Sequence, residues 1–375
     1  MIKKGSRSPI ILNKHIDIGT PDAESDAFYL EECFVDTGLF EQLLDCENPK
    51  RIVVGRTGSG KTALLQKIIS TQEHAIELAP EALSLSYISN SNIIRFFEAA
   101  GVNLSLFYVL LWRHVLTVEL LKMRFDIGNK AGVEKLKNFM EGIFKKDPAK
   151  EKGLKYLEKW GDEFWEHTEY RVKEFKEKLE AELSVSAGGN IKLFQLGAEG
   201  AASLTKEQRT EIVNRANDTV SRIQIKELQE IVSLLKENVF IDSQKPFYIV
   251  IDRLDEDWAD DELKFKLIKA LLETVKSFQT IRTTKVILSL RSDLLTRVLK
   301  ETVSSGFQEE KYAGLYLNMD WSESQLTEVI DARVNYLFKR KYTRENVKLE
   351  DIIKIGGQIQ KKSPIGYLIG NAPNF

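Results

Sequence analysis

The sequence has few cysteines and histidines and no strong excess of either charge. Only 2 cysteines and 4 histidines occur in 375 residues. Cys33 and Cys46 form no CxxC pair and the histidines are scattered, so we expect neither a disulfide framework nor a zinc site. A formal net charge of -2 provides no overall field that would attract nucleic acid or an acidic membrane surface. The spacing of Cys33 and Cys46 indicates that both are reduced thiols with a structural role.

The sequence also lacks a hydrophobic run typical of a secretory signal or a membrane span. The positively charged N-terminus contains only the short apolar run "PIIL". The most apolar stretch runs from Asn103 to Leu121, but Arg113 and His114 lie at its centre. An arginine within a bilayer costs at least about 2.5 kcal/mol. We predict a buried core helix at this stretch, and a cytoplasmic protein that does not bind membranes.

What the sequence does contain is an alternation of apolar strands and helices. Hydrophobic residues make up 43% of the chain, which is enough for at least one large core. Residues 28–45 have helix-like apolar spacing. Some of the candidate strands are almost continuously apolar, as expected for a parallel sheet covered by helices on both faces. The candidate strands are 51–55, a segment near 81–88, 246–252 and 285–291.

The pattern along the chain predicts four parts. Between the second and third candidate strands, strong helix formers predict a mostly helical insertion. Its glycine-rich segment 185–203 predicts a hairpin or a mobile loop of unassigned role. Its lysine-rich segment 134–160 is interpreted as a solvated helical face, with nucleic-acid contact as the alternative. The parts are a flexible N-terminal arm (1–26), a core (27–125 and 240–320), the insertion (126–239) and a partial helical lid (321–375).

The segment "GRTGSGKT", from Gly55 to Thr62, matches the phosphate-loop pattern GxxxxGK[ST] between a predicted strand and a predicted helix. Glycines let the backbone approach a phosphate, and the helix N-terminus adds positive partial charge. Lys61 is expected to reach the β- and γ-phosphates, and the Thr62 hydroxyl to ligate Mg²⁺. The predicted nucleotide-binding residues are Gly55, Gly58, Ser59, Gly60, Lys61 and Thr62.

A phosphate loop needs an acidic residue to hold magnesium, and "PFYIVIDRLDEDW" provides one. Asp252 follows the apolar run 247–251, which places it at the carboxyl edge of the predicted sheet. A water-activating carboxylate commonly follows the metal-binding acid directly, but Arg253 occupies that position. The base is therefore Asp255 or Glu256, or hydrolysis is slow. The alternative for these two acids is a solvated loop that caps the next helix.

The predicted strand "KVILSLR" ends in Ser289 and Arg291, either of which could contact a γ-phosphate. We favour Arg291 because a guanidinium bridges phosphate oxygens in a fork. The alternative is an ordinary ion pair with Asp293 or with an acid of the "DEDWADDE" segment.

Together "GRTGSGKT", "IVIDRLDEDW" and "VILSLR" resemble the AAA+/STAND group of P-loop ATPases, whose NACHT and KAP members carry a D-x-L-D-E/R loop. With "FVDTG" and "MDWSESQLTEVIDARVNYL", the segment from about 26 to 340 resembles a bacterial ATPase family often encoded in phage-defence and mobile-element islands. The resemblance implies an α/β P-loop NTPase fold of the ASCE/AAA+ kind. It also implies ATP and Mg²⁺ as ligands, metal ordering by Asp252, hydrolysis supported by Asp255 and Glu256, and γ-phosphate sensing by Arg291.

The chain departs from that resemblance at its end. The predicted helix "SESQLTEVIDARVNYLFKRKY" starts a lid, from which Arg333 or Arg340 could approach nucleotide, but the remaining segment is too short to complete one. We therefore expect a protein partner or a homo-oligomer to supply what is missing. DNA contact is an option that the sequence neither requires nor excludes. The leading hypothesis is an ATPase that acts as a switch or motor subunit, and the alternatives are a non-hydrolysing nucleotide-binding module and a small-molecule kinase.

Overall fold

The computed structural model describes the chain over residues 18–19, 25–80, 92–126, 134–135, 138–139, 141–142, 196–214, 232–302, 309–341 and 345–352. The chain forms two compact units. The first contains residues 1–41, 57–67 and 319–375, and the second contains residues 42–56 and 68–318.

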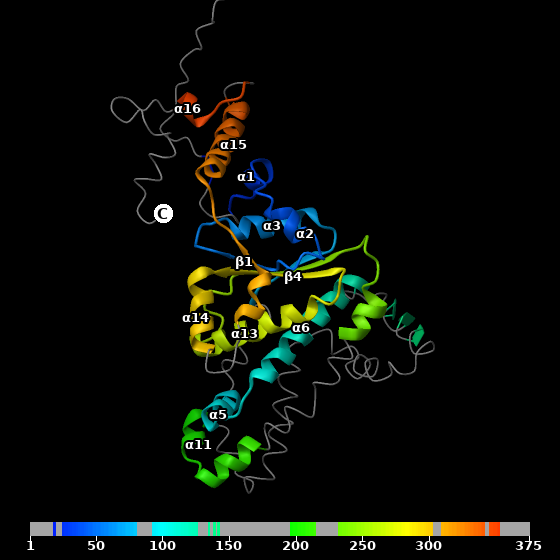
Figure 1. Ribbon diagram of the computed structural model, residues 1–375, viewed down its shortest axis with the longest axis vertical. Helices are drawn as coiled ribbons and strands as arrows, with labels where there is room; N and C mark the ends of the chain where they lie inside the picture. The colour runs from blue at the N-terminus through cyan, green and yellow to red at the C-terminus, as the bar shows by residue number, and fades with distance from the viewer. Residues whose placement is uncertain are drawn as a thin grey trace, which may run out of the picture. The chain divides into compact units, whose positions relative to one another are not determined.

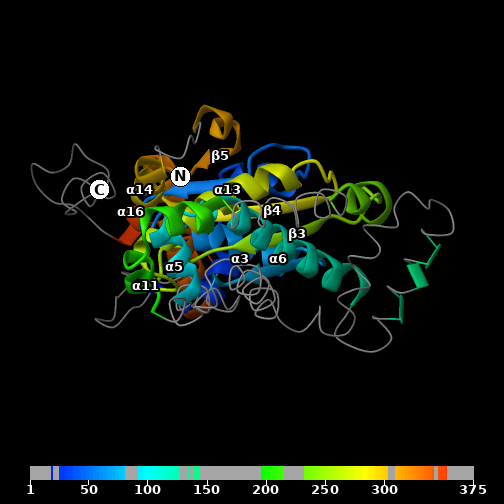
Figure 2. The same ribbon diagram turned by 90° about the horizontal axis from the view of Figure 1, so that it is seen from below.

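The second unit is built on an all-parallel sheet, so the predicted α/β class is confirmed (Figure 1; Figure 2). The strand order is β2-β3-β4-β1-β5, which places β4 between β1 and β3. The strands are β1 (Ile52–Gly55), β2 (Ala75–Leu78), β3 (Phe247–Ile251), β4 (Thr284–Arg291) and β5 (Tyr316–Asn318).

The central strands are strands because they are short, apolar and buried on both faces. Every residue of β1 and β3 is buried, and in β4 only Arg291 is not. Continuous burial is what a parallel sheet under helical layers requires. The strands predicted at 51–55, 246–252 and 285–291 are therefore confirmed.

The two edge strands were not predicted. β2 is half-buried over most of its length, and β5 has only 3 residues, so neither carries the continuous apolar run of a central strand. The segment near 81–88, which was predicted as the second strand, lies outside the described residues.

Helices α6 (Ser105–Phe125), α13 (Asp261–Phe278) and α14 (Ser292–Thr302) pack together, with α13 in contact with both others and with β4 (Figure 1). The predicted core helix at 103–121 is confirmed, because most side chains of α6 are buried. The Trp112 indole Nε1 donates to the carbonyl oxygen of Leu267 at 2.9 Å, which joins α6 to α13. Asp260 caps α13 by accepting the Leu263 amide at 3.1 Å.

One helix of the predicted insertion packs against a helix of the predicted core. Helix α5 (Asn92–Ala100) lies beside α11 (Ala198–Ala202), about a hundred residues later in the sequence (Figure 2). Residues 206–214 are also helical, and a π-helical turn, η4 (Leu235–Val239), precedes β3. The expectation of a hairpin or loop is wrong for 198–202, where Ala201 is fully buried and alanines favour a helix. Most of the segment 185–203 lies outside the described residues.

The first unit contains α1 (Ala27–Glu32), α15 (Glu323–Lys341) and α16 (Leu349–Ile352). The lid helix predicted after Trp321 is therefore present as α15. Its buried residues Val334, Leu337 and Phe338 form a small core with Val347. Asp331 accepts the Leu349 amide at 2.8 Å, which fixes α16 to α15.

Two further helices, α2 (Leu39–Leu44) and α3 (Lys61–Thr71), contain residues of both units. The helix-like spacing at 28–45 gives two short helices, α1 and α2, rather than one. Between them the Gly38 amide donates to Asp36 Oδ1 at 2.8 Å, and Gly38 has a φ of 79°. This non-helical turn directly precedes α2, so the two helices are separate although the apolar spacing continues.

Candidate functional site

The phosphate-loop segment has the predicted strand before it and the predicted helix after it. β1 ends at Gly55 and α3 begins at Lys61. Gly58 and Gly60 have φ values of 77° and 85°, which side chains with a Cβ rarely adopt. The first amide groups of α3 point out of the helix start, where backbone donors have no partner within the helix. The loop therefore has the backbone geometry from which phosphate cradles are made.

Lys61 and Thr62 are the first two residues of α3. Lys61 is buried, with 9% of its surface exposed, and Thr62 is half-buried. Buried lysine at a helix start adds a full charge to the partial charge of the helix terminus. This pair supplies the cation and the hydroxyl that a nucleotide with its metal requires.

A tryptophan of the first unit, which was not predicted from the sequence, binds the loop within that unit. Trp321 Nε1 donates to the Ser59 carbonyl oxygen at 2.6 Å. Met319 is buried in the same place, and its Cε would lie 3.2 Å from a Cβ placed on Gly60. The sequence offers no signal for this contact, because residues 59 and 321 are far apart in the chain.

Arg333, one of the two lid arginines that could approach nucleotide, is engaged elsewhere. It forms an ion pair with Asp26, whose side chain is buried, and donates to the Ile18 carbonyl at 3.2 Å. Its guanidinium also lies over the Tyr29 ring at 5.7 Å. Within the first unit, Arg333 thus attaches α15 to residues that the sequence assigned to the N-terminal arm.

In the second unit, Asp252 follows β3 directly and is 7% exposed. Its Oδ1 accepts the Arg253 amide at 2.9 Å. Arg253 has a φ of 58°, in the left-handed region, and its guanidinium lies 3.6 Å from Glu77 Oε1 on β2. The chain therefore turns sharply after Asp252, and Arg253 is directed to the neighbouring edge strand. Glu77 was not predicted.

The loop after Asp252 is fastened by apolar side chains, while its acids face solvent. Leu254 and Trp258 are buried, and Trp258 Nε1 donates to the Leu254 carbonyl at 3.2 Å. Asp255 and Glu256 are exposed, and the Glu256 amide donates to the Arg253 carbonyl at 3.2 Å. The two candidates for the base, Asp255 and Glu256, therefore lie on a loop that the buried side chains of Leu254 and Trp258 hold in place.

Arg291 is at the tip of β4 and is bound to two acids. Its Nε and Nη2 donate to Asp293 at 3.0 and 2.8 Å, and its Nη1 donates to Asp255 Oδ2 at 3.3 Å. These bonds raise the pKa of Arg291 and lower that of Asp293. The ion pairs considered as the alternative for Arg291 are therefore both present. Ser289, the other candidate on this strand, is 4% exposed.

The register of the sheet brings these parts to one edge. Gly55 of β1 pairs with Arg291 of β4, and Leu288 of β4 pairs with both Ile52 and Ile251. Asp252 is therefore level with Ser289, and the Arg291 tip extends two residues beyond it. The origin of the phosphate loop, Arg291 and Asp252 lie at the carboxyl edge of three adjacent strands, where ligands bind in open α/β sheets.

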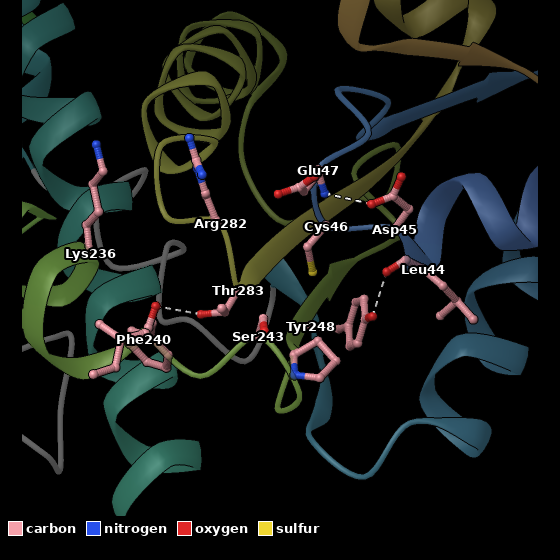
Figure 3. Close-up of a pocket in the computed structure, with 12 residues that line it drawn as sticks. Leu44, Asp45, Cys46, Glu47, Lys236, Phe240, Ser243, Tyr248, Arg282 and Thr283 are labelled. Carbon is pink, nitrogen blue, oxygen red and sulfur yellow. Dashed lines mark hydrogen bonds between the residues drawn. The ribbon is translucent and has the colours of Figure 1, made fainter.

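The opposite, amino edge of the sheet holds a cavity of about 580 Å³ (Figure 3). Tyr248 points toward the α2–β1 connection, where its hydroxyl donates to the Leu44 carbonyl at 2.7 Å. Thr283 donates to the Phe240 carbonyl at 2.8 Å. The Cys46 thiol also lies here, and burial raises its pKa. Cys33 and Cys46 are both free thiols.

Two features are absent from the described part of the chain. No helix there is long and apolar enough to span a membrane. No group of three or more His, Cys, Asp or Glu side chains there could hold a metal ion.

In comparisons with known proteins, no family model, no curated protein and no solved structure matches this chain.

Proposed function

We propose that this protein is an ATP-binding and ATP-hydrolysing P-loop ATPase of the ASCE/AAA+-like kind, which acts as a nucleotide-controlled switch or motor subunit. The observation that carries the proposal is the convergence at the carboxyl edge of β1, β4 and β3. Gly55, where the glycine loop begins, ends β1, Arg291 ends β4 and Asp252 follows β3, so the start of the loop, an arginine and a buried acid lie at the ends of three adjacent strands.

The loop residues supply binding. Backbone N–H groups for the phosphates would come from Gly55, Gly58, Ser59 and Gly60. Lys61 would contribute the charge that holds the terminal phosphates. The structural support is local: glycine φ values that a larger residue rarely adopts, and a buried Lys61 at the first position of α3.

Magnesium fits the donor chemistry of the site. The Thr62 hydroxyl and the Asp252 carboxylate offer oxygen atoms, which are the ligands that Mg²⁺ prefers. When bound with ATP, the ion would neutralise phosphate charge. Asp252 would hold it, and the Arg253 amide keeps that carboxylate oriented.

Asp255, Glu256 and Arg291 are proposed to support turnover. Asp255 and Glu256 are exposed on an anchored loop and are the available acids for positioning water. Arg291 would exchange its carboxylate partners for a γ-phosphate, since a fork-shaped guanidinium binds both kinds of anion.

A non-hydrolysing nucleotide-binding module is the second candidate, and one observation favours it. The residue after Asp252 is Arg253, which is turned toward Glu77, and one of the two candidate bases, Asp255, is engaged by Arg291. Either function leaves room for a protein partner or for self-association, which would complete the lid. A role in anti-phage defence rests on the motif resemblance alone, and no observation here favours a kinase.

The test is equilibrium binding of Mg-ATP by calorimetry, followed by phosphate release with and without DNA, on the wild type and Lys61→Ala. We expect micromolar binding by the wild type and a loss of about 100-fold or more in Lys61→Ala, because the terminal phosphates lose their buried cation. Equal affinity in the two proteins would overturn the phosphate-loop assignment. Tight binding without phosphate release would favour the non-hydrolysing module.

A further inference from the structure

The contact between Trp321 and the phosphate loop involves a backbone group rather than a side chain. The indole Nε1 donates to the Ser59 carbonyl oxygen at 2.6 Å, and Trp321 is half-buried. A carbonyl within a glycine-rich loop has few other restraints, because glycine allows both halves of φ/ψ space. A single strong bond there can decide which way the peptide faces.

A trans peptide is planar, and its C=O and N–H groups point in opposite directions. The indole holds the Ser59 carbonyl on the Trp321 side, so the N–H of Gly60 faces away from Trp321. If the Ser59–Gly60 peptide rotated, the loop would present a carbonyl oxygen where it now presents a donor. For an anionic ligand this is the difference between attraction and repulsion.

The surroundings of Gly60 restrict the same peptide from a second side. Gly60 has a φ of 85°, and a Cβ at this position would lie 3.2 Å from Met319 Cε and 3.4 Å from the Trp321 ring. The loop therefore packs closely on the segment that connects β5 to α15.

The Ser59 hydroxyl is a second polar group of the loop that a ligand could bind. This hydroxyl is buried, and no hydrogen-bond partner for it occurs among the described residues. Burying a hydroxyl without a hydrogen-bond partner is unfavourable. A loop that leaves this group unsatisfied, while its carbonyl is firmly bound, is arranged for a polar ligand.

We propose that Trp321 is a positioning residue for the phosphate loop, whose indole N–H holds the Ser59–Gly60 peptide so that the Gly60 N–H faces bound phosphate. This deepens the proposed function and rests on it. Trp321 touches the loop and not the reacting atoms. Its position two residues before α15 also means that a change in this peptide reaches the first turn of the lid helix.

The experiment compares the full-length wild type with Trp321→Phe, which keeps an aromatic ring and removes the N–H donor. Calorimetry measures the Kd of Mg-ATP and, separately, of inorganic tripolyphosphate, which has no base. We expect roughly a three- to tenfold weaker Kd for both ligands, the effect of losing one hydrogen bond. A loss for Mg-ATP with no change for tripolyphosphate would mean a contact with the base and would overturn the proposal.

The matched control is Trp112→Phe, which removes an indole N–H bond of the same kind between α6 and α13. It is expected to lower the melting temperature but to leave both Kd values within about twofold, as for independent sites. Equal weakening of phosphate binding in the two variants would show a general loss of stability and would overturn the proposal.

A second measurement does not depend on the variant's affinity. In a wild-type sample with ¹⁵N-labelled tryptophan, the indole signal that is missing from Trp321→Phe should shift when tripolyphosphate is added. A signal that stays unchanged at saturation would overturn the proposal. If the wild type binds neither ligand, the proposed function fails and this inference fails with it. If the wild type binds both and Trp321→Phe is unchanged, only this inference fails.

Discussion

The two ends of the sheet treat charged side chains in opposite ways. At the amino edge, Lys285 and Arg51 are fully buried and donate to backbone carbonyls of the segment 42–51 and its neighbours. At the carboxyl edge, Arg291 is about 39% exposed and donates to two exposed carboxylates. Backbone carbonyls are fixed by the fold, whereas exposed carboxylate side chains can rotate away and let another anion bind the cation. The difference separates cations that hold the fold from one that is able to bind a ligand.

Lys285 shows what the structural end requires. Its Nζ donates to the carbonyl oxygens of Gln42, Asp45 and Asn48 at 2.8, 2.6 and 3.3 Å, which satisfies the turn between α2 and β1. Burial, and then the charge of Arg51, lower the pKa of Lys285 to about 7. The nearby Cys46 and Asp45 groups favour the charged form but do not outweigh burial. Lys285 thus links the start of β4 to the end of α2 and the turn after it.

Magnitudes explain why the carboxyl edge can change partners. An exposed ion pair contributes about 0.2–1 kcal/mol. A hydrogen bond to a charged group contributes about 1.5–3 kcal/mol. Displacing Asp293 from the partly exposed Arg291 would therefore cost the fold little. The same exchange at Lys285 would leave buried carbonyls without donors and is unfavourable.

The largest expected effect comes from the buried acid of the carboxyl edge. Asp252→Asn keeps the side-chain shape and removes its charge, so the metal loses a ligand while the fold stays intact. We expect phosphate release to fall by about 100-fold or more, as for other groups that stabilise charge in the transition state, and the magnesium requirement to rise. Phosphate release across a magnesium titration measures both.

The control for this change is Asp242→Asn, an exposed acid in the turn before β3 that accepts the Gln244 amide at 3.0 Å. It should leave turnover unchanged. Normal turnover of Asp252→Asn at every magnesium concentration would remove Asp252 from the metal site.

The next effect is on stability and belongs to the amino edge. Lys285→Met leaves three backbone carbonyls without their donor, and we expect the free energy of unfolding to fall by about 2–4 kcal/mol. The Kd of Mg-ATP should not change, because this end of the sheet is structural. Denaturant unfolding and calorimetry check the two halves of the prediction. The exposed Lys245→Met should stay within about 0.5 kcal/mol of the wild type.

The pH dependence of the wild type tests the same residue. The pKa of Lys285 in the folded protein, about 7, lies below the ordinary lysine value of 10.5. Between these values the unfolded chain holds a proton that the folded chain lacks, so the free energy of unfolding rises with pH from 7 upward. The slope due to Lys285 is at most about 1.4 kcal/mol per pH unit, and it disappears below pH 7. Lys285→Met should lack this contribution; an identical slope in both proteins would contradict the lowered pKa.

The sequence alone was enough for the central strands and the phosphate loop, because both leave local signals. Continuous apolar runs predict β1, β3 and β4, and Asp252 follows from where β3 ends. Glu77 and Trp321 could not be predicted in this way, since their contacts with Arg253 and Ser59 join residues far apart in the chain. Short edge strands such as β5 depend on the neighbouring strand more than on their own residues.

The smallest expected effect distinguishes the two interpretations of Arg291. If Arg291 exchanges carboxylates for a γ-phosphate, Arg291→Ala should lower phosphate release by about tenfold and weaken ATP binding by less than about threefold. Asp293→Asn, in contrast, keeps the guanidinium and removes the charge of its competitor. ATP binding by Asp293→Asn should be equal to the wild type or tighter by about twofold, because less has to be displaced.

The alternative makes the opposite prediction for the second variant. If Arg291 only holds Asp255 and Asp293 in place, both variants break the Arg291–Asp293 ion pair, so both should lower phosphate release. Arg291→Ala also releases Asp255, and the double variant then adds nothing to Arg291→Ala. If Arg291 binds phosphate, the double variant resembles Arg291→Ala, and Asp293→Asn alone does not. Phosphate release by the two single variants and the double variant, with calorimetric Kd values for each, decides whether the exposed cation of the carboxyl edge differs in kind from the buried one at the amino edge.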